Sequence, residues 1–163
     1  MGHRLGESYQ QTMEIIKLIP NMSISSAGKC DSSPDAPTFC NAGLSDEINI
    51  QTETRFPEHS YPRHATFDFV EGKLNKIRVD GCASGISQVR LLEKKFGKYS
   101  TVTDMPFRNT TGSLAFDKEW DWAFSNGERL YVLESIDTES CGGYAATVIF
   151  ERPLQPKKAV NPY

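Results

Sequence analysis

The sequence predicts an α+β fold in which two helices pack on one face of a twisted antiparallel sheet of about five to seven strands. Two segments repeat apolar residues at helical spacing, several others alternate apolar with polar residues, and turn signals separate the alternating segments. The chain has 163 residues, which is enough for one compact domain. We expect a single domain over residues 1–152, with possible halves at 4–80 and 81–152, and a flexible tail at 153–163.

The first helix is expected from Ser8 to about Ile19. Ser8 and Gln11 form a capping box, the apolar residues that follow recur at helical spacing, and a proline closes the segment. Residues 21–63 are mostly polar and are interrupted by four prolines. We therefore expect a long connection there, with one short strand at about 47–54.

A hairpin is expected after this connection. Its first strand, at 66–70, places Phe67 and Phe69 on one face and Asp68 on the other. A glycine-containing turn then reverses the chain, and residues 74–79 return as the partner strand.

The second helix is expected at 85–96, because apolar residues form one stripe there and Gly97 supplies a left-handed C-terminal cap. An extended segment should follow at 99–103. Residues 106–112 are expected to form a loop.

The chain then predicts three further strands. In the first, Trp120 and Trp122 alternate with smaller or polar residues. Asn126-Gly127 is the strongest short hairpin signal in the sequence, because both central residues of a two-residue hairpin turn take positive φ. The return strand is expected at 130–136, and the last strand at 144–150.

The two hairpins suggest an internal repeat. Phe67-Asp68-Phe69 aligns with Trp120-Asp121-Trp122, and in both copies a glycine turn and a leucine follow. One helix precedes each hairpin, so the order predicts a tandem helix-hairpin duplication. Coincidence is the alternative, because alternation in any hairpin produces such triplets.

Three short patterns resemble those of small bacterial extracytoplasmic domains. They are Leu5-Gly6-Glu7-Ser8 before a helix, Phe-x-x-Gly-Lys-Leu-x-x-Ile from Phe69, and Leu-x-x-Lys-Phe-Gly-Lys from Leu92. The group includes the SmpA-type outer-membrane assembly lipoproteins and the β-lactamase-inhibitor-protein-like domains. The resemblance implies helices on one face of an antiparallel sheet, an envelope or secreted location, and a role in holding another protein. The long connection at 21–63 and the lack of a lipid-accepting N-terminal cysteine depart from the assembly lipoproteins.

Four cysteines are scattered along the chain, and none lies in a Cys-x-x-Cys pair. This pattern favours two disulfides in an oxidising compartment over a zinc knuckle. Of the three possible pairings we favour Cys30 with Cys40 and Cys82 with Cys141. Four reduced thiols in a cytosolic protein are the alternative. We expect a periplasmic or secreted protein whose leader is absent from this sequence.

Composition limits the classes of function. Eighteen Lys and Arg against 21 Asp and Glu give a net charge of −3, which disfavours nucleic-acid binding. No apolar run approaches the roughly 20 residues of a transmembrane helix. His3 is expected in a disordered end, and His59 and His64 in solvated loops, so we expect no metal and no cofactor. The motifs of serine hydrolases, nucleotide-binding loops and zinc proteases are missing from the sequence, and no catalytic residue is assigned.

Asp68 and Asp121 occupy matching hairpin positions and are expected to point away from the aromatic residues. Acids on a half-buried sheet usually lie on its wet side, but two acids in a cleft can serve acid-base catalysis. A small hydrolase therefore stays an alternative, as does a carrier with a ligand pocket between the helices and the sheet.

An aromatic stripe is the most informative feature for function. It forms either the core under the helices or a set of binding anchors on an open sheet. We expect a non-enzymatic extracytoplasmic module, of the inhibitor or envelope-assembly type, that binds another protein through the open sheet face. The candidate binding residues are Trp120, Trp122, Phe67, Phe69, Asp68, Asp121 and Tyr131.

Overall fold

A computed structural model describes residues 3–29, 48–54, 63–108, 114–137, 141 and 143–153. In chain order its elements are α1 (Tyr9–Lys17), β1 (Met22–Lys29), β2 (Ile48–Thr54), β3 (Arg63–Val70), β4 (Lys73–Gly81), α2 (Gly85–Phe96), β5 (Thr101–Arg108), β6 (Leu114–Ala123), β7 (Arg129–Asp137) and β8 (Gly143–Glu151). The predicted α+β class with an antiparallel sheet is confirmed. The sheet has eight strands, more than the five to seven expected.

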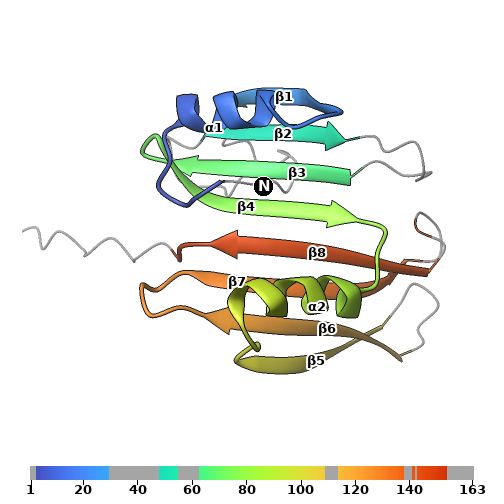
Figure 1. Cartoon of the computed structure of the whole chain (residues 1–163). Helices are drawn as coiled ribbons and strands as arrows, with labels where there is room; N and C mark the ends of the chain where they lie inside the picture. Colours follow the sequence, from blue (N-terminus) through green and yellow to red (C-terminus); the bar gives the residue numbers. More distant parts are fainter. Residues whose placement is uncertain are drawn as a thin grey trace, which may run out of the picture.

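The strands lie in the order β1-β2-β3-β4-β8-β7-β6-β5, and every neighbouring pair is antiparallel. Each half of the chain contributes one helix followed by four consecutive strands. The last strand of each half, β4 or β8, lies at the centre of the sheet, where the two pair (Figure 1). The hairpins that align in sequence are not equivalent in this order, because β3–β4 closes the first half whereas β6–β7 lies in the middle of the second.

The α1 helix begins as the sequence predicts. Ser8 is its N-cap, and both hydrogen bonds of the capping box with Gln11 are formed. The residues before it are also part of the fold: the Gly6 amide donates to the Leu74 carbonyl at 2.8 Å, and the Leu74 amide donates to the Glu7 carbonyl at 2.8 Å. The expectation of a disordered end around His3 is wrong.

His3 is held by a core contact. Its side chain is only 1% exposed, its ring lies edge-on to Phe67 with centroids 4.9 Å apart, and its Nδ1 is 3.2 Å from Glu7 Oε2. The N-terminal segment therefore covers part of the sheet on the helix side.

The α2 helix spans the residues that the sequence predicts and ends before Gly97, whose φ is +81°. Its first turn lies very close to the sheet. The Gly85 amide donates to Glu134 Oε2 at 2.5 Å, and a Cβ at Gly85 would lie 2.9 Å from the Trp120 ring. Only glycine permits this approach, because any other residue would place a Cβ atom against the sheet. The negative charge of the Glu134 carboxylate is stabilised by the positive N-terminal end of the helix dipole.

The two hairpin turns differ. Glu71 and Gly72 both have positive φ and close β3–β4 as a two-residue loop. At β6–β7 only Gly127 has positive φ, and the Gly127 amide donates to the Phe124 carbonyl. The loop therefore has three residues, Ser125 to Gly127, so the predicted two-residue turn at Asn126-Gly127 is wrong.

The core lies on one face of the sheet. Cross-strand pairing places one row of apolar side chains across six strands: Ile50, Phe67, Ile77, Phe150, Leu130 and Trp122. Ile16 of α1 packs into the cluster at one end of this row, and Val89 of α2 packs into the cluster at the other end. Figure 1 draws both helices on the same side of the sheet.

Two strands differ from the sequence-based expectation. β1 lies in what we expected to be a connection, and β5 continues through Pro106 to Arg108, where we expected a loop. Both are edge strands, and an edge position tolerates proline because one side of its backbone needs no ladder partner.

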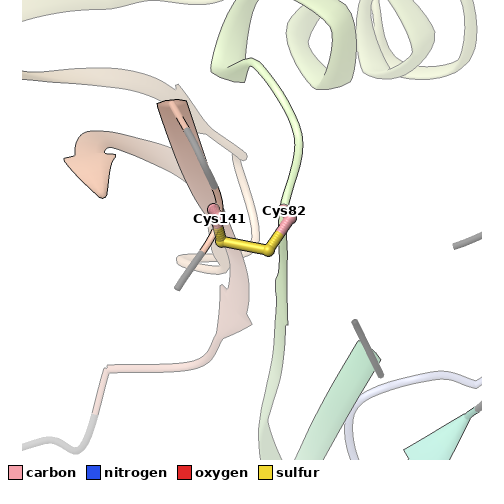
Figure 2. Close-up of a disulfide and its surroundings, with 2 residues drawn as sticks. All are labelled: Cys82 and Cys141. Carbon is pink, nitrogen blue, oxygen red and sulfur yellow. A yellow bond between two sulfur atoms is a disulfide. The ribbon is translucent and has the colours of Figure 1, made fainter. Parts of the chain in front are cut away.

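Cys82 and Cys141 form a disulfide, with sulfur atoms 2.12 Å apart (Figure 2). Cys82 follows β4 and leads into α2, while Cys141 precedes β8. The predicted pairing of Cys82 with Cys141 is confirmed, and the bond also holds the end of the β4–β8 junction. The predicted Cys30–Cys40 pair lies outside the described residues.

Candidate functional site on the open sheet face

The face of the sheet opposite the core carries the candidate site, which we call the open face. Its residues alternate along the central strands with the apolar residues that the helices cover. Neither helix lies on this side (Figure 1). By cross-strand register the open face includes His64, Thr66, Asp68, Lys76, Arg78, Asp80, Glu119, Asp121, Arg129, Tyr131, Leu133, Thr147, Ile149 and Glu151.

Arg129 on β7 is the centre of the largest charge cluster on the open face. Its Nη2 donates to Asp121 Oδ2 on the adjacent strand β6, and lies 3.8 Å from Glu119 Oε1. The hydrogen bond that Arg129 donates to Asp121 raises the pKa of Arg129 above its ordinary value, and the nearby carboxylates add to that effect. One guanidinium therefore serves two carboxylates.

Tyr131 joins this cluster to the centre of the sheet. Its ring lies under the Arg129 guanidinium, with the Arg129 Cζ atom 5.3 Å from the ring centroid. Burial, the negative charge of the nearby Glu151 carboxylate and a hydrogen bond with Glu151 together raise the pKa of Tyr131 to about 12. Glu151 also pairs with Lys76 Nζ at 3.4 Å.

A second group of polar contacts lies on β4 and β8. Arg78 Nε donates to both carboxylate oxygens of Asp80, at 3.0 and 2.9 Å. The Thr147 hydroxyl donates to Asp80 Oδ1 at 2.5 Å across the junction of the two halves. Between the two groups Ile149 is 6% exposed, so the centre of this face is apolar and largely buried.

Four of the seven predicted binding residues are placed in the core. Phe67, Phe69, Trp120 and Trp122 are 0%, 0%, 5% and 2% exposed. Trp122 also donates its ring N–H to the Gly97 carbonyl at 2.8 Å, which ties it to the end of α2. This corrects their assignment as binding anchors, because a partner on the open face does not reach them.

Tyr131, Asp68 and Asp121 lie on the open face, but the two acids do not form a pair. Asp68 is on β3 and Asp121 on β6, four strand spacings apart. Neighbouring strands lie about 4.8 Å apart, so the separation is roughly 19 Å. Paired catalytic carboxylates lie within about 10 Å of each other, and the geometry gives no support to a carboxylate pair.

The sequence analysis did not single out Arg129, Glu151, Lys76 or Glu119. Each of them alternates with a core residue along its strand, which is a weak signal for position on the wet face. Arg129 meets Glu119 through the β6–β7 hairpin, whereas Lys76 meets Glu151 through the pairing of β4 with β8, which joins residues about 70 positions apart. No local pattern contains that pairing.

Other parts of the described chain hold no stronger site. A shallow depression on the helix side is lined by side chains of β4, α2 and β8, among them Val79, Gln88 and Val148. Within the described ranges no group of three or more histidine, cysteine or acidic side chains is arranged to hold a metal ion. Neither α1 nor α2 has the length and apolar character needed to cross a membrane.

Comparisons of the chain with family models, with curated proteins and with solved structures give no significant match.

Proposed function

We propose that the chain is a non-enzymatic protein-binding module that docks another protein on its open face. The observation that carries the proposal is the composition of that face: an apolar centre around Ile149 and Tyr131, surrounded by fixed ion pairs, on the side of the sheet opposite both helices. Protein interfaces have this anatomy, with an apolar centre and a polar rim.

The surface is also organised before a partner arrives. Arg129 is held by Asp121 and stacks on Tyr131, and Lys76 is held by Glu151. Side chains that are already fixed lose little conformational entropy on binding, so more of the contact energy goes into affinity. Tyrosine and arginine are also enriched among the residues that dominate binding energy.

The proposal includes an oxidising, extracytoplasmic setting. A structural disulfide such as Cys82–Cys141 persists in secreted and envelope proteins and is rare in the cytosol of mesophiles. We also propose that the two halves arose by tandem duplication, which the repeated order of one helix and four strands supports. The resemblance to envelope-assembly and inhibitor domains agrees with this setting.

Site-specific photocross-linking tests the proposal. A photoreactive amino acid is placed at His64 or Thr103, which are exposed at opposite sides of the open face, and at Leu91, which is 60% exposed on α2. The three proteins are irradiated in extract from the cells that produce the chain. We expect the same covalent adduct from positions 64 and 103, and no such adduct from position 91.

An adduct formed only from position 91 would place docking on the helix side and contradict the proposal. Equal adducts from all three positions would indicate nonspecific contact and would contradict it as well. Thermal unfolding of each labelled protein before irradiation controls for loss of the fold.

A further inference from the structure

We infer that the partner presents a basic protein surface to the open face, with a lysine or arginine side chain seated beside Glu119 and Asp121 on β6. The inference deepens the proposed function and depends on it for the place of docking. It stands on the distribution of charge over that face.

The open face is acidic. Among the open-face residues whose side chains the structure describes, six carry carboxylates, Glu53, Asp68, Asp80, Glu119, Asp121 and Glu151, and four carry permanent cations, Lys73, Lys76, Arg78 and Arg129. Lys76 pairs with Glu151, and Arg78 pairs with Asp80. The excess of negative charge favours a cationic partner, because complementary charge speeds encounter and suppresses partners of the wrong sign.

The excess is greatest at one place on β6. Arg129 bonds to one oxygen of Asp121, and within the described part of the chain the other oxygen, Oδ1, is buried and has no hydrogen-bond partner. Glu119 lies 3.8 Å from the same guanidinium, and its side chain is 24% exposed. Two carboxylates thus share one cation, and Glu119 is the one that a second cation would reach.

The small number of ligands favours a side chain of a protein over a bare metal ion. Glu119 and Asp121 are two residues apart on one strand face, and such positions lie about 7 Å apart. Their side chains can converge on one cation, but a calcium or magnesium ion takes six or more oxygen ligands, and the described residues hold no group of three acidic, histidine or cysteine side chains arranged for a metal. An ammonium or guanidinium on a long stem can lie between them. The same negative charge repels nucleic acid.

Peptide binding followed by nuclear magnetic resonance tests the inference. The probes are hexalysine and hexaglutamate, added separately to the isotope-labelled chain with its disulfide intact. We expect hexalysine to shift the backbone amides of β6 and β7 and hexaglutamate to leave them unchanged. Raising the salt concentration should weaken hexalysine binding, because exposed charges are screened.

Three variants locate the cation. Glu119→Gln should weaken hexalysine binding two- to fivefold, the range for one exposed ion pair, while Glu14→Gln on α1 is a charge-matched control and should leave it unchanged. Arg129→Gln should strengthen binding two- to fivefold, since it removes the cation that competes for Glu119 and Asp121. A purely structural role of Arg129 predicts the opposite sign.

Hexaglutamate binding at β6 and β7, equal loss with Glu14→Gln, or weaker binding with Arg129→Gln would each overturn the inference. These outcomes leave the proposed function standing if positions 64 and 103 still cross-link a partner. Conversely, hexalysine binding at β6 without any cross-link from those positions would defeat the proposed function alone.

Discussion

The two faces of the sheet use the same strands in opposite ways. Along β7, Leu130 and Val132 point into the core beneath α2, while Arg129 and Tyr131 point to the open face. One face is closed by buried apolar residues, and the other carries most of its charged side chains in ion pairs at the surface. Successive residues of a strand point to opposite faces, so within each strand one set of alternate residues stabilises the core and the other set is available for recognition.

A single residue in a loop decides this separation. With the three-residue β6–β7 loop, Trp122 lies opposite Leu130 and Trp120 lies opposite Val132. A two-residue turn at Asn126-Gly127 would place Trp122 opposite Tyr131. A one-residue change of register moves a whole set of side chains to the other face, so this loop keeps Tyr131 available for binding.

The largest effect is expected on the covered face. Phe67→Ala should lower the free energy of unfolding by about 3–5 kcal/mol, because a fully buried ring is replaced by a cavity. Urea unfolding measures it. His64→Ala, on the same strand but on the open face, should change that free energy by less than about 0.5 kcal/mol. Similar effects of the two variants would break the comparison.

The disulfide belongs to neither face and holds the junction of the halves. The double variant Cys82→Ser with Cys141→Ser should lower the free energy of unfolding by about 2–4 kcal/mol, because 59 residues separate the two cysteines and the unfolded chain gains their freedom. Tryptophan fluorescence during urea unfolding measures the change. A difference below about 0.5 kcal/mol would mean that the junction is held by β4–β8 pairing alone.

Removing a carboxylate on the helix side of the sheet is expected to lower the free energy of unfolding more than removing one on the open face. Glu134→Ala should lower the free energy of unfolding by about 2 kcal/mol, because the Gly85 amide and the Ser84 hydroxyl lose their acceptor at the start of α2. Glu119→Ala is the matched change on the open face and should cost less than about 1 kcal/mol. Equal losses in urea unfolding would contradict the division between the faces.

The smallest effect is a pH dependence on the open face. The pKa of Tyr131 is raised to about 12, above its ordinary value of about 10, so the folded chain holds this proton more tightly than the unfolded chain. The resulting stability is present below pH 10 and is lost as pH rises from about 10 to 12. At this half-exposed site we expect about 1 kcal/mol after allowance for solvent screening.

Comparison of the wild type with Tyr131→Phe measures this effect. Unfolding in urea is followed at several pH values between 9 and 12, and only the wild type should show the added loss. Identical pH profiles would mean that the proton of Tyr131 is not protected by Glu151 and burial.

Local patterns were enough for much of the fold. The capping box at Ser8, the stripe of α2 and the Glu71-Gly72 turn each depend on residues within a few positions of one another. β1 was missed because it is rich in serine and lies at an edge, where alternation with apolar residues is weak. The length of the loop before β7 was predicted wrongly, because the register of β6 with β7 depends on burying Trp120 and Trp122 in the core and not on the turn residues alone.

The candidate site was less accessible to prediction. The parity of β3 and β6 correctly sends Asp68 and Asp121 to one face and the aromatic residues to the other. The contacts of Arg129 with Glu119 and Asp121 follow from the β6–β7 hairpin, but the Lys76–Glu151 pair is set by the pairing of β4 with β8, and that contact joins the two halves of the chain. His3 shows the same limit at the N-terminus, because its burial depends on Phe67, more than sixty residues away.

β8 is the last strand in the described part of the chain, yet it lies inside the sheet between β4 and β7. During synthesis, which proceeds from the amino end, β4 and β7 each present a bare ladder of amides and carbonyls until residues 143–151 emerge. Unpaired edges of this kind recruit strands from other molecules. A chaperone, or exchange of β8 between two nascent copies, would occupy that gap, so domain-swapped dimers joined through β8 are the expected misfolded product of slow synthesis.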